Sequence, residues 1–118
     1  MSATHPHDDQ TTVAQLKATV RDFCSARDWD RYHNPKDLAI GVITEASELL
    51  EHFRFQNERQ QLELLANPIS RAEIEAELAD VLTFVVRFAE RFDIDLASTL
   101  AAKLIQNARK YPVPDRTD

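Results

Sequence analysis

Apolar side chains recur at spacings of three and four residues through most of the chain, which is the period of an amphipathic α-helix. The pattern predicts long helices over residues 12–26, 35–53, 71–91 and 96–110, with a short helix over 58–66 in the connection before the third. Each predicted long helix has one apolar stripe that must be covered. The sequence therefore predicts an all-α fold in which antiparallel helices form a four-helix-bundle-type core.

Apolar positions in these helices identify the candidate core, together with Cys24, which we expect to be buried. The positions predicted to face inward are Leu38, Val42, Leu49 and Phe53 in the second long segment (widened by Ile43, Ala46 and Leu50), Leu78, Val81, Leu82, Val85, Phe88 and Phe92 in the third, and Leu96, Leu100 and Leu104 in the last. A chain of 118 residues predicts one domain. We place it over residues 12–112, between a flexible tail at 1–11 and a C-terminal tail at 113–118.

Capping residues mark the expected helix starts. Asn34 precedes Pro35, and asparagine caps free N–H groups while proline suits the first helical position. Ser70 and Glu73 have the spacing of a capping box. We therefore expect the third long helix to begin near residue 71, after a break at Asn67.

Gly41 is the only glycine in the chain. Tight hairpins and phosphate-binding loops use glycine for positive φ or close backbone approach, so a hairpin-rich β fold and a glycine-rich phosphate loop are both disfavoured. Inside a helix, glycine costs about 1 kcal/mol relative to alanine. Close approach of a ligand or neighbouring helix would explain Gly41, as would ordinary tight packing or drift.

The charge balance excludes some partners. Lys and Arg number 14 and Asp and Glu number 20, for a net charge of −6, which argues against binding to a nucleic-acid backbone. Phosphate can still bind through metal ions held by carboxylates. With one cysteine, no apolar leader segment and no apolar run long enough to span a bilayer, the sequence predicts a cytoplasmic protein without membrane association.

Two pairs of acids border the apolar stripes of the second and third long helices. Glu45 and Glu48 are three residues apart, as are Glu77 and Asp80, so each pair projects from one side of its helix. If the pairs face each other, their charges repel unless cations lie among them. Carboxylate oxygens suit Mg²⁺, with Mn²⁺ as a substitute.

Other interpretations of the acids remain open. They could form the solvated face of a non-catalytic helical interaction module. A di-iron centre is disfavoured because the Glu-x-x-His pairs typical of such bundles are absent. Glu51 continues the first series by three residues, either as a proton acceptor beside the metal ligands or as an exposed acid.

Basic and aromatic side chains provide candidate nucleotide contacts. Lys103 and Asn107, followed by Lys110 and Tyr111, form a stripe that can meet phosphate oxygens, although lysine near a helix C-terminus also compensates the helix dipole. The aromatic candidates for stacking on a base are Trp29, His33, Phe53 and Phe55, of which Phe53 is expected in the core.

These motifs, in this order, resemble those of MazG-like nucleoside triphosphate pyrophosphohydrolases, most closely the dCTP pyrophosphatase branch. The matching segments are Arg27-Asp28-Trp29, His33, Pro35, Leu38, Glu45 to Glu51, Glu77 to Leu82, Asp95-Leu96, Lys103, Asn107 and Lys110-Tyr111-Pro112. The chain departs from the family pattern at Thr44 and Ser47, where glycine is common, and at Phe55, where tryptophan is common. The departure at Phe55 bears on base preference.

The resemblance implies an all-α fold whose protomers pair, as a homodimer or homotetramer, to complete four-helix bundles. It implies Mg²⁺-dependent hydrolysis of a nucleoside triphosphate to the monophosphate and pyrophosphate. The implied metal ligands are Glu45, Glu48, Glu77 and Asp80; the implied phosphate contacts are Lys103, Asn107 and Tyr111; and the implied base pocket is formed by Trp29 and His33.

The functional hypothesis is therefore hydrolysis of a (deoxy)nucleoside triphosphate, with dCTP or a modified pyrimidine nucleotide as the candidate substrate, in nucleotide pool control or sanitation. Metal ions held by the acids would orient the attacking water, and either Glu48 or Glu51 would accept its proton. The alternative is the non-catalytic interaction module with a solvated acidic face.

Overall fold

The computed structural model describes residues 5–115 and contains five α-helices and, in that range, no strand. The α-helices are α1 (Val13–Ala26), α2 (Pro35–Glu51), α3 (Glu58–Ala66), α4 (Pro68–Arg91) and α5 (Leu96–Lys110), with short 3₁₀ turns at Asp8–Gln10 and Asp30–Tyr32. The predicted all-α fold is confirmed. Residues 1–4 and 116–118 of the two predicted tails lie outside the described range.

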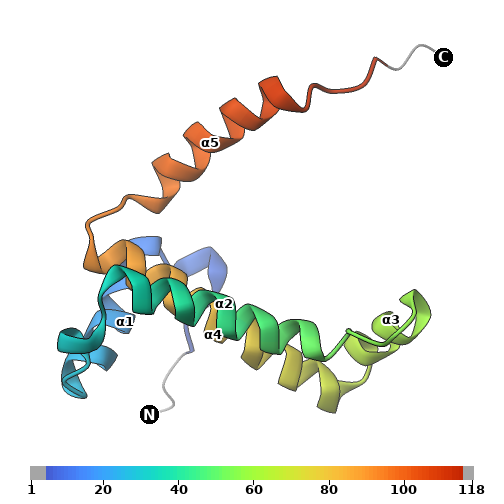
Figure 1. The fold of residues 1–118 in the computed structure, drawn as a ribbon, viewed down its shortest axis with the longest axis horizontal. Helices are drawn as coiled ribbons and strands as arrows, with labels where there is room; N and C mark the ends of the chain where they lie inside the picture. The colour runs from blue at the N-terminus through green and yellow to red at the C-terminus, as the bar shows by residue number, and fades with distance from the viewer. Residues whose placement is uncertain (1–4, 116–118) are drawn as a thin grey trace.

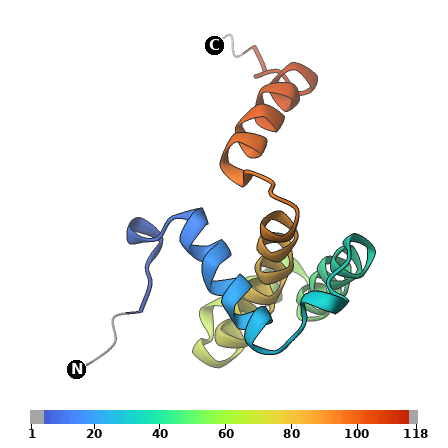
Figure 2. The same cartoon turned by 90° about the vertical axis from the view of Figure 1, so that its left-hand side faces the viewer.

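The centre of the fold is an antiparallel pair formed by α2 and α4, with α3 at the turn between them (Figure 1). Helix α1 packs against the other side of α4 (Figure 2). The two helices approach closely at Gly41, where the ring of Phe84 lies over the glycine. The single glycine therefore marks close helix packing, one of the explanations that its position in the sequence suggested.

The fully buried core of this single chain is small. It comprises Cys24, Leu38, Ile74, Val86 and Ala89. The predicted burial of Cys24 is confirmed, and its thiol is free. These residues come from α1, α2 and α4, so three helices share the core that the described chain provides.

Helix α4 begins earlier than predicted. Its N-cap is Asn67, whose side chain accepts hydrogen bonds from the backbone N–H groups of Ile69 and Ser70, with Pro68 at the first helical position. The predicted capping box at Ser70 is wrong, because the Ser70 hydroxyl instead donates to the carbonyl of Leu64 at 2.5 Å. Asn67 acts as Asn34 does at the start of α2, where the same Asn-Pro pair is followed by helix.

Many apolar side chains predicted to face inward are exposed in the single chain. The exposed residues around the α2–α4 pair are Ile43 (69% exposed) and Leu50 on α2, Leu78, Leu82 and Val85 on α4, and Phe92 directly after α4. On α5, Leu100 and Leu104 are also exposed. For a single chain the prediction of their burial is wrong, because no element of the described chain covers these faces.

Helix α5 extends away from the other helices and packs along none of them (Figure 1). The radius of gyration is 17.8 Å, whereas a compact chain of this size has about 13 Å. The accessible surface is 9747 Å², compared with about 6,500 Å² for a compact monomer of this mass. A single protomer therefore leaves a large apolar surface without a partner. None of the helices in the described range is both long and apolar enough to span a membrane.

Candidate metal centre

The packing of α2 against α4 brings three of the four predicted acids together. Glu45 and Glu48 extend from α2 and Glu77 from α4, and one carboxylate oxygen from each lies within 4.8 Å of the others. Glu77 is 29 positions beyond Glu48 in the sequence, and the three acids share one small volume because the two helices run side by side. This arrangement is a candidate site for a divalent cation.

Two oxygen atoms in this cluster are buried without a hydrogen-bond partner: Oε2 of Glu45 and Oε2 of Glu77. A buried acceptor left unsatisfied costs free energy, and more so when it is charged. A cation among the three carboxylates would satisfy both oxygens and cancel the repulsion. The donor set consists only of carboxylate oxygens, which fits Mg²⁺ or Mn²⁺ and does not favour Zn²⁺.

Burial and close carboxyl neighbours raise the pKa values of two of these acids, Glu45 and Glu77. Burial, followed by the neighbouring Glu48, raises the pKa of Glu45 above its ordinary value. The close carboxyl of Glu48, followed by burial, raises the pKa of Glu77. The charge of Asp80 contributes to both shifts, so the fourth predicted ligand lies near the cluster, although it is outside the group of three.

Glu51 occupies a different environment. Its side chain is 60% exposed and forms an ion pair with Arg54 at 3.2 Å. Glu51 is not among the charges that shift the pKa of Glu45 or Glu77. Of the two predicted proton acceptors, only Glu48 lies within the carboxylate cluster.

The predicted base-binding residues Trp29 and His33 are neighbours at the 3₁₀ turn that follows α1. Their ring centroids are 6.1 Å apart at an angle of 53°. Phe23 of α1 meets the Trp29 ring edge-on at 5.7 Å, and Trp29 remains 40% exposed. Trp29 thus offers an accessible indole beside an imidazole.

Phe55 stands apart from that pair. It follows the end of α2 and is 84% exposed, with the Arg54 guanidinium 4.9 Å from its ring centroid. An aromatic ring so exposed has no packing role within the single chain.

The predicted phosphate contacts all lie on or just after α5. Lys103 donates to Gln106 at 3.3 Å, and the Lys110 ammonium lies 5.4 Å from the centroid of the Tyr111 ring. Asn107 is partly buried. Because α5 does not pack along α2 or α4, one protomer does not assemble these groups around its own acids.

Sequence reasoning missed one charged residue of the interior, Arg87. Its side chain is 1% exposed and pairs with Asp30 and Glu90. An available signal was its place in the apolar run from Phe84 to Phe88, since an arginine on a buried helix face requires partners. Asp30 lies in the loop between α1 and α2, too far along the chain for helical periodicity to reveal the pair.

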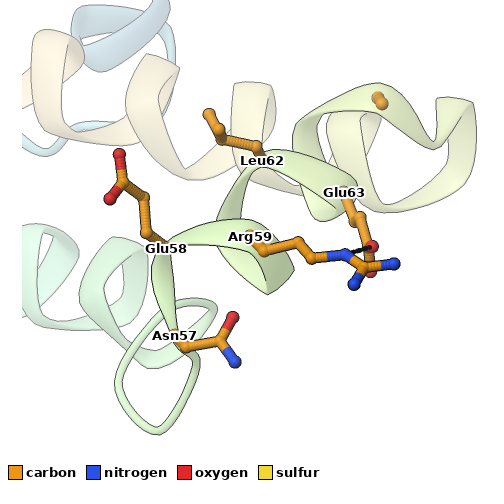
Figure 3. A pocket seen from close by; sticks show the side chains of 6 residues that line it. Asn57, Glu58, Arg59, Leu62 and Glu63 are labelled. Atoms are coloured by element: carbon orange, nitrogen blue, oxygen red, sulfur yellow. Dashed lines mark hydrogen bonds and ion pairs between the residues drawn. The ribbon is translucent and has the colours of Figure 1, made fainter.

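A separate open hollow lies over α3 (Figure 3). Its lining residues are Asn57, Glu58, Arg59, Leu62, Glu63 and Ala66. Arg59 and Glu63 pair with each other across one turn at 3.1 Å, and none of the predicted site residues lines the hollow. It therefore has no part in the candidate centre.

Comparison with known proteins agrees with the sequence resemblance. A family model described as the MazG-like family matches residues 40–118. The dCTP pyrophosphatase 1 of Bos taurus is 30% identical over 104 residues, which is 88% of this chain. The Homo sapiens protein of the same name is 30% identical over 103 residues, or 87% of this chain. The chain spans 62% and 61% of the lengths of these two relatives.

A solved structure supports the fold over nearly the whole chain. The crystal structure of a pyrophosphatase from Archaeoglobus fulgidus matches with a TM-score of 0.79 and 31% sequence identity, covering 95% of this chain and 100% of that one. The overall helical fold described above is therefore similar to that of an experimentally determined protein.

Proposed function

The chain belongs to the MazG-like family, and from that premise we propose that it hydrolyses a (deoxy)nucleoside triphosphate to the monophosphate and pyrophosphate. Two of its relatives are named dCTP pyrophosphatases, which supports dCTP or a modified pyrimidine nucleotide as the substrate. The proposed physiological role is control or sanitation of the cytoplasmic nucleotide pool.

The observation that carries the proposal is the pair of buried, unsatisfied carboxylate oxygens on Glu45 and Glu77. Together with Glu48 and the nearby Asp80 they would hold Mg²⁺, or Mn²⁺ in its place. When bound, the metal would neutralise triphosphate charge and make water a better nucleophile. A purely structural acidic face would point into water instead and leave no buried oxygen unpaired.

The side chains of the protein supply the remaining roles in the proposed mechanism. Glu48 lies inside the cluster and is the better placed proton acceptor for the attacking water. Glu51 would reach that water only after releasing Arg54, to which it is now paired. Trp29 and His33 would contact the base. Phe55 follows the other end of α2, so it would reach that base only from a partner protomer, where a phenylalanine in place of the common tryptophan gives a smaller stacking surface.

A second copy of the chain is part of the proposal. The exposed apolar residues of α5 include Leu100, Leu104 and Ile105, and they need a covering surface that one protomer does not provide. Burying them in a homodimer or homotetramer would complete the helical bundle. It would also allow α5 of one protomer to bring the candidate phosphate contacts to the acids of its partner; these contacts are Lys103, Asn107, Lys110 and Tyr111.

The direct test is incubation of the purified protein with dCTP, other nucleoside triphosphates and Mg²⁺, followed by separation of all products. We expect equal amounts of monophosphate and pyrophosphate, and no turnover when the divalent cation is chelated. Release of orthophosphate alone, or no turnover of any nucleotide, would contradict the proposal. The second result would favour the non-catalytic interaction module.

A further inference from the structure

A buried guanidinium joins α4 to the loop before α2, outside the carboxylate cluster. Arg87 is seven residues beyond Asp80 on α4, which is two helical turns, or about 10 Å, along the same face. At that point the Asp30–Tyr32 turn and His33 pack against α4 through Arg87. The loop that carries Trp29 is thus attached to the helix that carries two of the acids.

Arg87 makes three specific contacts. Nη1 donates to Oε2 of Glu90 at 2.6 Å, Nη2 donates to Oδ1 of Asp30, and Nε donates to Nδ1 of His33 at 2.9 Å. Two carboxylates therefore compensate one buried cation, which is what its burial requires. The bond to His33 is the contact that charge compensation does not explain.

This bond determines the state of the His33 ring. A guanidinium has only donors, so Nδ1 of His33 must present a lone pair. A neutral imidazole with an accepting Nδ1 carries its proton on Nε2. Arg87 therefore selects the Nε2–H tautomer of His33.

The charges around His33 oppose protonation of its second nitrogen. Burial, followed by the positive charge of Arg87, lowers the pKa of His33 below its ordinary value; Arg91 also lowers the pKa, and Asp30 opposes the shift. Arg91 acts from the next turn of α4, where it donates to the backbone carbonyl of Asp30 at 3.0 Å. At neutral pH His33 is thus an uncharged ring with one donor.

We propose that Arg87 is a positioning residue that holds His33 as a hydrogen-bond donor toward the nucleotide stacked on Trp29. The two rings meet at 53°, so a base lying flat on the indole would meet the edge of the imidazole rather than its face. Nε2–H would then select a base that presents a carbonyl oxygen or unprotonated ring nitrogen. A base presenting an amino group at that point would be disfavoured. This inference rests on the proposed function for its ligand.

The first experiment measures the tautomer directly and needs no substrate. Long-range ¹H–¹⁵N correlation NMR of the full chain, labelled at histidine, reports which nitrogen of each ring carries a proton, and His33→Asn identifies the signals. We expect Nε2–H with an unprotonated Nδ1 at pH 7. The Nδ1–H tautomer, or a charged ring, would overturn the assignment.

Substitution of the two arginines then tests the cause. Arg87→Lys retains the charge but removes Nε, so we expect mixed tautomers and a higher pKa for His33. Arg91→Lys is the matched control because Arg91 does not contact the ring, and we expect it to preserve the wild-type tautomer. Equal spectra for Arg87→Lys and wild type would refute the role of Arg87. Should Arg87→Lys fail to fold, the wild-type measurement still decides the tautomer.

Kinetics test the effect on the nucleotide. His33→Asn keeps an acceptor for Arg87 but loses the distal donor, whereas His33→Gln places an amide N–H close to the position of Nε2. We expect KM to rise about tenfold in His33→Asn, the loss of roughly one good hydrogen bond, with a smaller rise in His33→Gln and a smaller effect on kcat than on KM. Equal KM values for the two variants would contradict the donor role. If the wild type hydrolyses no nucleotide, the proposed function fails while the tautomer result stands on its own.

Discussion

The ring of Phe84 on α4 fills the space into which a side chain at Gly41 on α2 would project. A Cβ built on Gly41 would lie 2.3 Å from Cε1 and 2.4 Å from Cδ1 of that ring, far inside van der Waals contact. The two helices that carry the acids are therefore held at a spacing that only glycine permits. Gly41 lies one turn before Glu45, so this spacing also sets the distance between the carboxylates.

Gly41→Ala is expected to destabilise the protein by about 1–3 kcal/mol, the usual cost of overpacking. Helix propensity alone predicts the opposite sign, a gain of about 1 kcal/mol, so denaturant unfolding decides between the two effects. Adding Phe84→Leu should restore part of the lost stability by making room for the methyl group. A stabilised Gly41→Ala protein would show that the helices can separate at no cost.

Neutralising one acid of the cluster is expected to stabilise the metal-free protein. Glu45→Gln and Glu77→Gln each remove a charge from a group of mutually repelling carboxylates, so the melting temperature without divalent cation should rise. The increase in melting temperature that Mg²⁺ produces in the wild type should be lost. Thermal unfolding with Mg²⁺ and with a chelator measures both effects.

Glu51→Gln is the matched control for these two variants. Glu51 lies on the same helix, but it is exposed and paired with Arg54, so the melting temperature should change little and the response to Mg²⁺ should persist. If Glu45→Gln and Glu51→Gln show the same melting temperature and the same response to Mg²⁺, the acids form an ordinary solvent-exposed face and the proposal of a metal site is wrong.

The contacts around Arg87 predict a loss of stability in acid. The hydrogen bond from Arg87 lowers the pKa of Asp30, and burial lowers the pKa of His33. A depressed pKa in the folded state means that the unfolded chain binds protons first. The stabilisation from His33 is therefore complete above pH 6.5, the ordinary pKa of histidine, and declines as the pH falls toward the lower pKa of His33 in the folded protein. The stabilisation from Asp30 is lost at lower pH still, because the ordinary pKa of a carboxyl group is lower.

Urea unfolding at a series of pH values measures this dependence, with His33→Asn as the comparison. The free energy of unfolding of the wild type minus that of the variant should decrease as the pH falls below 6.5. Subtraction is needed because the raised pKa values of Glu45 and Glu77 act in the opposite direction, stabilising the metal-free fold on acidification. A difference that does not change with pH would mean that His33 does not titrate as the contacts require.

The apolar face of α5 is expected to mediate self-association. Leu104→Glu places a charge on that face, where Leu104 is 55% exposed in one chain, and should shift the protein to monomers in sedimentation velocity. Hydrolysis should fall at least tenfold if the groups on α5 complete the site of a partner. Gln106→Glu introduces the same charge elsewhere on the helix and should preserve the assembly. A wild-type protein that sediments as a monomer would contradict this prediction.

The sequence by itself determined the local features of this protein. Apolar periodicity predicted each long helix, and the three-residue spacing in Glu45–Glu48 and Glu77–Asp80 placed each pair on one side of its helix, because such relations depend only on helical geometry. The start of α4 was missed where two caps competed within four residues. Asn67 takes the cap there because Pro68 already has the φ of the first helical turn.

Only the tertiary structure decided which faces meet. Periodicity shows that a helix has an apolar stripe but not what covers it, so Leu100 and Leu104 were expected inside and lie exposed. The same limit hid the pairing of Arg87 with Asp30. These two residues are 57 positions apart in the sequence and are brought together by the packing of the loop on α4. For the same reason the sequence could not distinguish Glu48 from Glu51 as the proton acceptor. The packing of α2 against α4 places Glu48 in the carboxylate cluster, whereas Glu51 is exposed. Long-range packing sets these outcomes, because burial and charge pairing depend on distances in space that local spacing does not contain.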